Sequence, residues 1–134
     1  MLDFGSVGVF HVDCVAAGIG RPRKFVRVEG LLVDTGSEFT WMPASVLAGA
    51  GVRVAKKDLE FVMANGQTIT RSTGYAILRS DDFETVDEVV FGQAGDLTLL
   101  GARTLEGFGA TVEPRKKRLV AAGPHFAARS GSRS

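Results

Sequence analysis

Short runs of Val, Phe, Leu and Ile, each bounded by turn residues, make up the hydrophobic pattern of this chain. Two such runs, at 6–17 and 24–33, lie on either side of residues 18–23, where glycines, arginines and a proline are typical of a wide turn. The pattern predicts two antiparallel strands, and the second delivers the chain to Asp34. A proline followed by an apolar segment that ends in glycine predicts one short helix at 43–49.

The middle of the chain carries the strongest local signal. Apolar and polar residues alternate at 59–64 and 67–78, and these runs flank Asn65-Gly66, a dipeptide that tolerates positive φ. We therefore predict a β-hairpin that turns at these two residues. Another strand is expected at 85–91, after the acidic turn at 80–84.

The last third of the chain predicts three further elements. Residues 97–101 read as a buried strand, and residues 102–106 as one or two helical turns that glycines terminate. Segments 110–113 and 118–122 predict a final hairpin. Residues 123–134 are small, polar and basic, so we expect them to form a disordered tail.

Two segments resemble each other within the chain. An apolar strand, a glycine-containing turn and a short helix occur at 31–48 and again at 97–107, which suggests internal two-fold symmetry. Seventeen glycines, only four prolines and many Val, Thr and Phe residues favour a turn-rich β protein over a helical bundle. The expected fold class is mainly β with one or two short helices, and 134 residues fit one domain.

Charge and cysteine content exclude several classes of function. Sixteen basic and fifteen acidic residues leave a net charge of +1, which argues against nucleic acid or an anionic membrane as partner. The chain has one cysteine, Cys14, and no Cys/His cluster with metal-ligand spacing, so we expect no metal and no cofactor. It has no apolar run of the roughly 20 residues that span a bilayer. Its N-terminus does not read as a signal peptide, and a lone cysteine that cannot form an intramolecular disulfide makes the reducing cytoplasm the expected location.

The motif Asp34-Thr35-Gly36-Ser37 has two interpretations when it is taken alone. In the first, the aspartate accepts backbone amides in an Asx-type turn after a strand, and Gly36 supplies an unusual φ. In the second, Asp34 is a catalytic carboxylate.

Two longer segments favour the catalytic interpretation. Residues 31–43, Leu-Leu-Val-Asp-Thr-Gly-Ser-Glu-Phe-Thr-Trp-Met-Pro, closely resemble the active-site strand of clan AA aspartic peptidases. Residues 99–114 resemble the apolar-apolar-Gly strand and short helix that close the retropepsin fold. The resemblance covers roughly residues 6–121 and is nearest to small single-lobe prokaryotic members. It implies a retropepsin-like single-lobe acid protease barrel over 1–122, with a glycine-containing flap hairpin.

The resemblance also implies a homodimer. Aspartic peptidases hydrolyse amides with two carboxylates that share one proton, and this chain contains a single Asp-Thr-Gly. The second carboxylate would be Asp34 of another copy, across a two-fold axis. By resemblance, the hydroxyl of Thr35 bonds across that axis and Gly36 allows close approach of the backbone. A Ser37 hydroxyl that donates to the carboxylate would favour its charged form, which predicts an acid-leaning optimum.

The resemblance suggests where a peptide substrate binds. Asn65, Gly66 and Gln67 correspond to the tip of the flap, a mobile hairpin that covers bound peptide, whereas the alternative is an ordinary surface turn. Leu99 and Leu100 are candidates for a substrate pocket. A peptide or protein substrate would bind in extended conformation between two lobes.

Other residues receive simpler interpretations. Trp41 is expected to pack beneath the active-site loop, and the basic segments at 21–24 and 115–118 are expected to be solvated turns. After Gly101 the chain lacks the Arg-Asn or Arg-Asp pair of retroviral enzymes, so their Arg-carboxylate contact cannot be carried over directly, and a pairing of Arg103 with Glu38 is considered in its place. Two alternatives to the peptidase stay open. One is a retropepsin-fold domain that binds or assembles peptides with little turnover, and the other is an unrelated β-barrel with a chance Asp-Thr-Gly.

Overall fold

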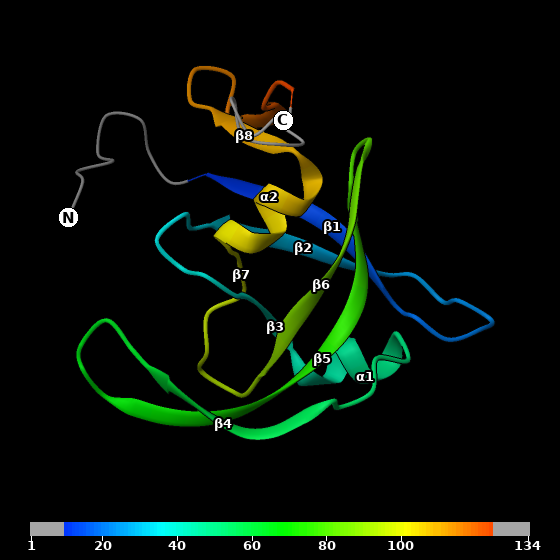
Figure 1. Cartoon of the computed structure of the whole chain (residues 1–134), viewed down its shortest axis with the longest axis vertical. Coiled ribbons are helices and arrows are strands. Elements are labelled where there is room, and N and C mark those ends of the chain that lie inside the picture. The colour runs from blue at the N-terminus through cyan, green and yellow to red at the C-terminus, as the bar shows by residue number, and fades with distance from the viewer. Residues whose placement is uncertain (1–9, 125–134) are drawn as a thin grey trace, which may run out of the picture.

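A computed structural model describes residues 10–124, which form nine strands and two short helices (Figure 1). The protein is therefore mainly β, as predicted. The strands are β1 (His11–Gly18), β2 (Val26–Val33), β3 (Thr40–Pro43), β4 (Lys56–Val62), β5 (Thr68–Ser80), β6 (Phe83–Gly92), β7 (Leu99–Leu100), β8 (Ala110–Glu113) and β9 (Arg118–Ala121). The helices are α1 (Ala44–Gly49) and α2 (Ala102–Phe108).

Seven of the strands form one sheet that closes on itself. Their order is β1-β2-β7-β3-β6-β5-β4, and β1 also pairs with β5. β8 and β9 form a separate two-stranded sheet at one end, beside α2 (Figure 1). The main core lies where the closed sheet meets the two helices, and Leu31, Leu47, Leu78, Val89 and Leu100 are fully buried there. Burial of these aliphatic side chains is the main force that holds the sheet closed.

The arrangement of six strands has an internal two-fold symmetry. The strand order and the directions of pairing stay the same when β1 exchanges with β5, β2 with β6 and β3 with β7. α1 follows β3 just as α2 follows β7. The symmetry suggested by the sequence is thus present, but the two equivalent units are longer than the predicted segments 31–48 and 97–107. One unit is β2-β3-α1, and the other is β6-β7-α2.

The loops that join the strands of each unit are also equivalent. The β2–β3 loop (34–39) and the β6–β7 loop (93–98) each have six residues, with glycine in the third position. Each begins with a turn in which the fourth residue donates its N–H to the carbonyl oxygen of the first, at 3.1 Å in one loop and 3.0 Å in the other. The glycine conformations differ, since Gly95 has a φ of 89° and Gly36 is not left-handed. Asp34 therefore corresponds to Gln93 in the second unit.

The predicted hairpin is present. β4 and β5 pair antiparallel and are joined by residues 63–67, in which Gly66 has a φ of 85°. Asn65 Oδ1 accepts the N–H of Gln67 at 2.9 Å and so stabilises the turn. The pairing of β5 with β6 begins at Thr73, which lies opposite Val90. The earlier part of β5, nearer the hairpin tip, pairs with β4 alone.

The structure differs from the predictions in one strand, and parts of two predicted segments lie outside the described residues. β3 was not predicted, because a four-residue run that ends in proline has little strand signal, and its pairing partners lie about 50 to 60 residues further along the chain. β1 begins at His11, and the first residues of the predicted 6–17 strand lie outside the described part. Most of the predicted tail, from 125 onward, also lies outside it.

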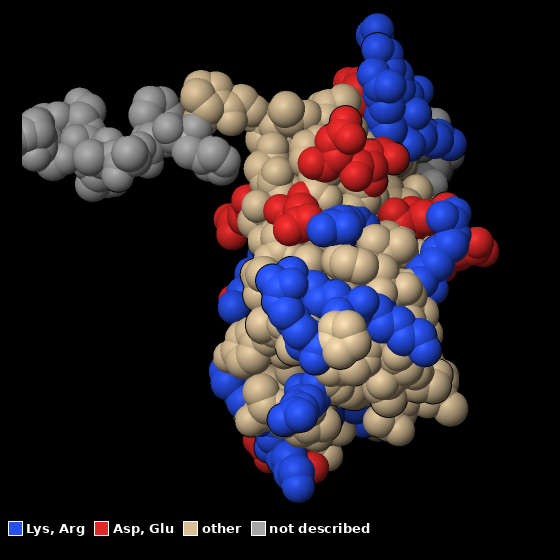
Figure 2. Space-filling model, turned by 90° about the vertical axis from the view of Figure 1, so that its right-hand side faces the viewer, with Lys and Arg blue, Asp and Glu red and all other residues tan. Residues whose placement is uncertain are grey.

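The basic segments are exposed turns, as predicted. Residues 21–24 belong to the β1–β2 turn, residues 115–117 belong to the β8–β9 turn and Arg118 begins β9, and all of them are exposed. Figure 2 shows the face on which the β1–β2 turn projects, where Lys and Arg side chains gather. Within the described residues, neither helix is long and apolar enough to cross a membrane.

Candidate functional site

Asp34 lies where β2 ends, and backbone hydrogen bonds hold both Asp34 and the loop that follows it. Its N–H donates to the carbonyl oxygen of Leu100 in β7 at 2.9 Å. The loop that follows is bonded to the start of α2, because Ala102 N–H donates to Ser37 O at 2.7 Å and Arg103 N–H to Glu38 O at 3.2 Å. The two strands and the helix therefore fix the position of the loop that carries Asp34.

Gly36 allows the carboxylate of Asp34 to approach the backbone. The Gly36 N–H donates to Asp34 Oδ1 at 2.9 Å, and a Cβ atom at Gly36 would lie 3.2 Å from that same oxygen. Gly36 does not have a left-handed φ, so the unusual φ assumed in the simple turn interpretation is wrong. Within residues 10–124, Oδ2 accepts no hydrogen bond and is free for a water or a second carboxyl group.

Ser37 and Thr35 differ in their surroundings. The Ser37 hydroxyl donates to the carbonyl oxygen of Phe39 at 2.9 Å. Its single proton is therefore committed, and the prediction that it donates to the Asp34 carboxylate is wrong for this structure. Thr35 is exposed beside Asp34 and lies outside the groove described next.

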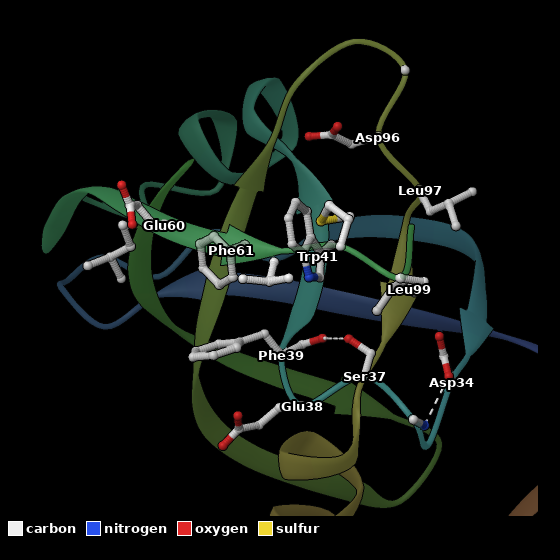
Figure 3. Close-up of a pocket in the computed structure, with 16 residues that line it drawn as sticks. Asp34, Ser37, Glu38, Phe39, Trp41, Glu60, Phe61, Asp96, Leu97 and Leu99 are labelled. Carbon is white, nitrogen blue, oxygen red and sulfur yellow. Dashed lines mark hydrogen bonds between the residues drawn. The ribbon is translucent and has the colours of Figure 1, made fainter. Parts of the chain in front are cut away.

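A groove of about 810 Å³ runs from Asp34 between the β2–β3 loop, β4 and the β6–β7 loop (Figure 3). Its lining residues are Asp34, Gly36, Ser37, Glu38, Phe39, Trp41, Leu59, Glu60, Phe61, Val62, Met63, Ala64, Gly95, Asp96, Leu97 and Leu99. The volume falls within the range of about 300–1,000 Å³ that is common for ligand pockets.

Aromatic side chains hold β4 over the floor of the groove. Phe61 of β4 contacts Phe39 and Trp41 edge-on, with ring centroids 5.4 and 5.3 Å apart. Trp41 is only 6% exposed and packs with Val90 and Leu99 in a second, smaller apolar cluster. The prediction that Trp41 is a packing residue is therefore confirmed, although one edge of it also lines the groove.

The predicted substrate-binding residues divide into two groups. Leu99 lines the groove. Leu100 does not, because adjacent residues of a strand face opposite sides and its side chain is fully buried in the main core. Asn65, Gly66 and Gln67 are exposed at the tip of the β4–β5 hairpin, beyond the residues that line the groove.

A chain of buried hydrogen bonds supports the loop from below. Thr40 Oγ1 accepts the N–H of Gly101 at 2.9 Å and lies 2.6 Å from Thr104 Oγ1, which donates to Asp87 Oδ2 at 2.7 Å. Arg103 lies 4.0 Å from Asp87, with its guanidinium over the ring of Phe39. The guessed pairing of Arg103 with the Glu38 carboxylate is therefore wrong, and the sequence contained no signal for Asp87.

The charged groups of the groove are all acidic. Asp34, Glu38, Glu60 and Asp96 line it, and no lysine or arginine does. Among residues 10–124, no three His, Cys, Asp or Glu side chains lie close enough together to hold a metal ion. Cys14 is not a candidate nucleophile, because burial raises the pKa of its thiol to about 11 and keeps it protonated at neutral pH.

Several lining residues were missed by sequence reasoning. Phe61 and Glu60 come from β4, and Asp96 and Leu97 from the β6–β7 loop. The alternation of Leu59, Phe61 and Met63 was a usable signal for an apolar face on the hairpin. A scan against protein-family models finds no matching family, and a search of curated proteins finds no match to this chain.

Proposed function

We propose that this protein is one half of a homodimeric, retropepsin-like aspartic endopeptidase, with Asp34 as its catalytic carboxylate. The observation that carries the proposal is the setting of Asp34, at the end of β2 and at one end of an apolar groove beneath a β-hairpin. One carboxylate oxygen is held by a glycine N–H, and the other is free among the described residues. In this proposal the closed sheet is the retropepsin-like barrel and the β4–β5 hairpin is its flap.

The symmetry within the chain supports the need for a second copy. Hydrolysis by this mechanism uses two carboxylates that share a proton. The second structural unit does not supply the second carboxylate, because its position equivalent to Asp34 is Gln93. The partner carboxylate is therefore Asp34 of another copy. Thr35 is exposed next to Asp34 of its own chain, as expected of a residue that bonds across a two-fold axis.

The chemistry requires only the two carboxyl groups and a water. The ionised Asp34 removes a proton from a water held between the pair, and the resulting hydroxide attacks the peptide carbonyl carbon. The protonated Asp34 of the partner copy donates a hydrogen bond to the carbonyl oxygen and stabilises the tetrahedral intermediate. Transfer of a proton to the leaving nitrogen then breaks the C–N bond and releases an acid and an amine.

The groove suits an extended peptide with apolar side chains. Phe39, Trp41, Phe61, Leu97 and Leu99 provide apolar surface next to Asp34. In this proposal the hairpin tip, Asn65 to Gln67, bonds to the substrate backbone and closes over it.

Cleavage of a diverse peptide library between pH 3 and 8, at several enzyme concentrations, tests the proposal. Asp34→Asn is expected to reduce cleavage by about 10³-fold or more, because the amide cannot act as a general base. Wild-type activity should rise faster than linearly with concentration while the dimer is only partly formed. The matched control is Asp82→Asn, which changes an exposed aspartate far along the chain in the β5–β6 turn and should leave cleavage unchanged.

Two results would contradict the proposal. Cleavage that survives in Asp34→Asn would exclude Asp34 as the catalytic group. A folded wild-type dimer that cleaves no peptide under any condition would favour a domain that binds or assembles peptides.

A further inference from the structure

Arg71 and Asp96 form an ion pair unlike the others in the described residues. Arg71 Nε lies 2.7 Å from Asp96 Oδ2 and Nη2 lies 2.9 Å from Oδ1, so the two planar groups bond at both positions. The side chains are only 18% and 14% exposed. By contrast, the Arg27–Asp13 and Arg79–Glu84 pairs are about half exposed or more. Partly buried two-point pairs of this kind are stronger and more specific than surface pairs.

The pair joins the base of the β4–β5 hairpin to the β6–β7 loop. Arg71 lies on β5 opposite Leu59 of β4, two residues beyond the last pairing of β5 with β6, at Thr73. This is the point at which the β4–β5 hairpin leaves the sheet. The hairpin beyond it is held to the rest of the molecule by side chains rather than by a third strand.

Asp96 belongs to the opposite wall of the groove. It lies in the β6–β7 loop between Gly95 and Leu97, and all three residues line the groove (Figure 3). Its carboxylate also accepts the N–H of Gln93 at 2.8 Å, so the group that Arg71 binds is itself hydrogen-bonded to the start of the β6–β7 loop. The pair therefore links the base of the hairpin to the opposite wall of the groove.

We propose that Arg71 and Asp96 are positioning residues that hold the β4–β5 hairpin down over the groove. They act through the hairpin and do not react. Their effect on turnover rests on the proposed peptidase function, but the position of the hairpin does not, and it can be measured separately. The contacts of Phe61 with Phe39 and Trp41 do not involve the ion pair, so the hairpin should loosen and open more often without unfolding.

The chain contains its own reporter of hairpin position. Trp41 is the sole tryptophan, is 6% exposed, and lies in one cluster with Phe61, Met63 and Ile69 of the hairpin. Lifting the hairpin would expose the indole to solvent. Quenching of its fluorescence by acrylamide therefore measures opening without any substrate.

The first test compares Arg71→Gln and Asp96→Asn with wild type. Each variant should raise the Stern–Volmer quenching constant of Trp41 roughly twofold or more and shift its emission to longer wavelength, because a looser hairpin admits the quencher. Arg79→Gln is the matched control. It removes another arginine–carboxylate pair from the same strand, far from Trp41, and should leave quenching unchanged.

Two further variants separate positioning from general destabilisation. Arg71→Lys keeps the charge but loses the two-point geometry, so its quenching should fall between those of wild type and Arg71→Gln. The exchange Arg71→Asp with Asp96→Arg should restore protection of Trp41. If Arg71→Gln does not fold, the nearly isosteric Asp96→Asn decides the question. Wild-type quenching in folded Asp96→Asn overturns the proposal.

A second readout connects the pair to turnover. If the protein cleaves peptides, Asp96→Asn should raise KM several-fold with a smaller change in kcat, because the walls that bind substrate are no longer held together. If no peptide is cleaved, the quenching measurements alone decide whether the pair positions the hairpin. Unchanged quenching together with cleavage that depends on Asp34 would reject the positioning role and leave the peptidase intact.

Discussion

At the scale of single residues, two buried threonines determine how the proposed catalytic loop is held. Thr104 donates its hydroxyl proton to Asp87, so Thr40 must donate to Thr104, and Thr40 in turn accepts the N–H of Gly101. This chain of bonds runs from the start of α2 through β3 to β6. Since Thr40 and Thr104 are fully buried, no water can replace a lost partner without a rearrangement.

Replacement of Thr104 by valine tests this network. The substitution keeps the shape but removes the donor to Asp87 and the acceptor for Thr40, so we expect a loss of about 1–3 kcal/mol in the free energy of unfolding. Urea denaturation measures it. Thr111→Val, at an exposed position of β8, is the control and should change stability by less than about 0.5 kcal/mol. Equal stabilities for the two variants would argue against the network.

Gly101 is a second residue on which the site depends. A Cβ atom there would lie 2.4 Å from Phe39 O and 2.9 Å from Glu38 O, both in the loop that carries Asp34. Gly101→Ala must therefore displace that loop, and we expect it to reduce cleavage at least about tenfold through misplacement of the carboxylate. Gly20→Ala, where nothing lies within 4 Å of the added methyl group, is the control for a glycine substitution. A fully active Gly101→Ala would show that the loop tolerates the shift.

At the scale of elements, the ionisation of Asp96 connects pH to the attachment of the hairpin. The hydrogen bonds from Arg71 lower the pKa of the Asp96 carboxyl below its usual value, and burial opposes this only in part. The carboxylate therefore stays charged in mildly acidic solution, where a pair of aspartates that share a proton would work. The same environment raises the pKa of the Arg71 guanidinium.

The lowered pKa predicts how stability depends on pH. A carboxyl group whose pKa is lower in the folded state stabilises the protein fully above the unfolded pKa of about 3.9, and this stabilisation is lost as pH falls through the folded value. Asp96→Asn removes the contribution, so the difference in unfolding free energy between wild type and variant should shrink below about pH 4. Urea denaturation from pH 3 to 6 measures the difference, with Asp82→Asn as the control, because Asp82 is exposed and makes no ion pair within the described residues. A difference that is independent of pH would contradict the assignment.

At the scale of the whole molecule, one chain offers a groove with one suitable carboxylate at its end. The internal symmetry brings two equivalent loops to the groove, but only the first begins with aspartate. The proposed enzyme is complete only when two copies meet at Asp34.

Mixing wild type with Asp34→Asn tests this shared site. If a threefold excess of the variant exchanges freely into dimers, only about a quarter of wild-type chains will pair with one another, and activity should fall to roughly that fraction. The same excess of Asp82→Asn should not inhibit, since that variant supplies an intact Asp34. Full activity in the first mixture, with exchange verified by labelled chains, would mean that one chain is sufficient.

The sequence by itself determined the order of the local elements other than β3, because their signals are local. The Asn65-Gly66 turn, the glycines that end α2 and the apolar run before Asp34 each specify their own segment. The prominence of Asp34-Thr35-Gly36 and the packing role of Trp41 followed from the same short stretch. The peptidase activity, the homodimer and the flap remain predictions.

Tertiary structure alone decided which distant residues meet. Arg71 and Asp96 are 25 positions apart, and Thr40 and Thr104 are 64 apart, so no periodicity in the chain relates them. The same holds for β3, whose strand character comes from β6 and β7. Leu99 and Leu100 are alike in sequence, but the pleat of β7 turns one toward the groove and the other into the core. Local propensity selects elements, whereas burial and long-range pairing select the neighbours that build the site.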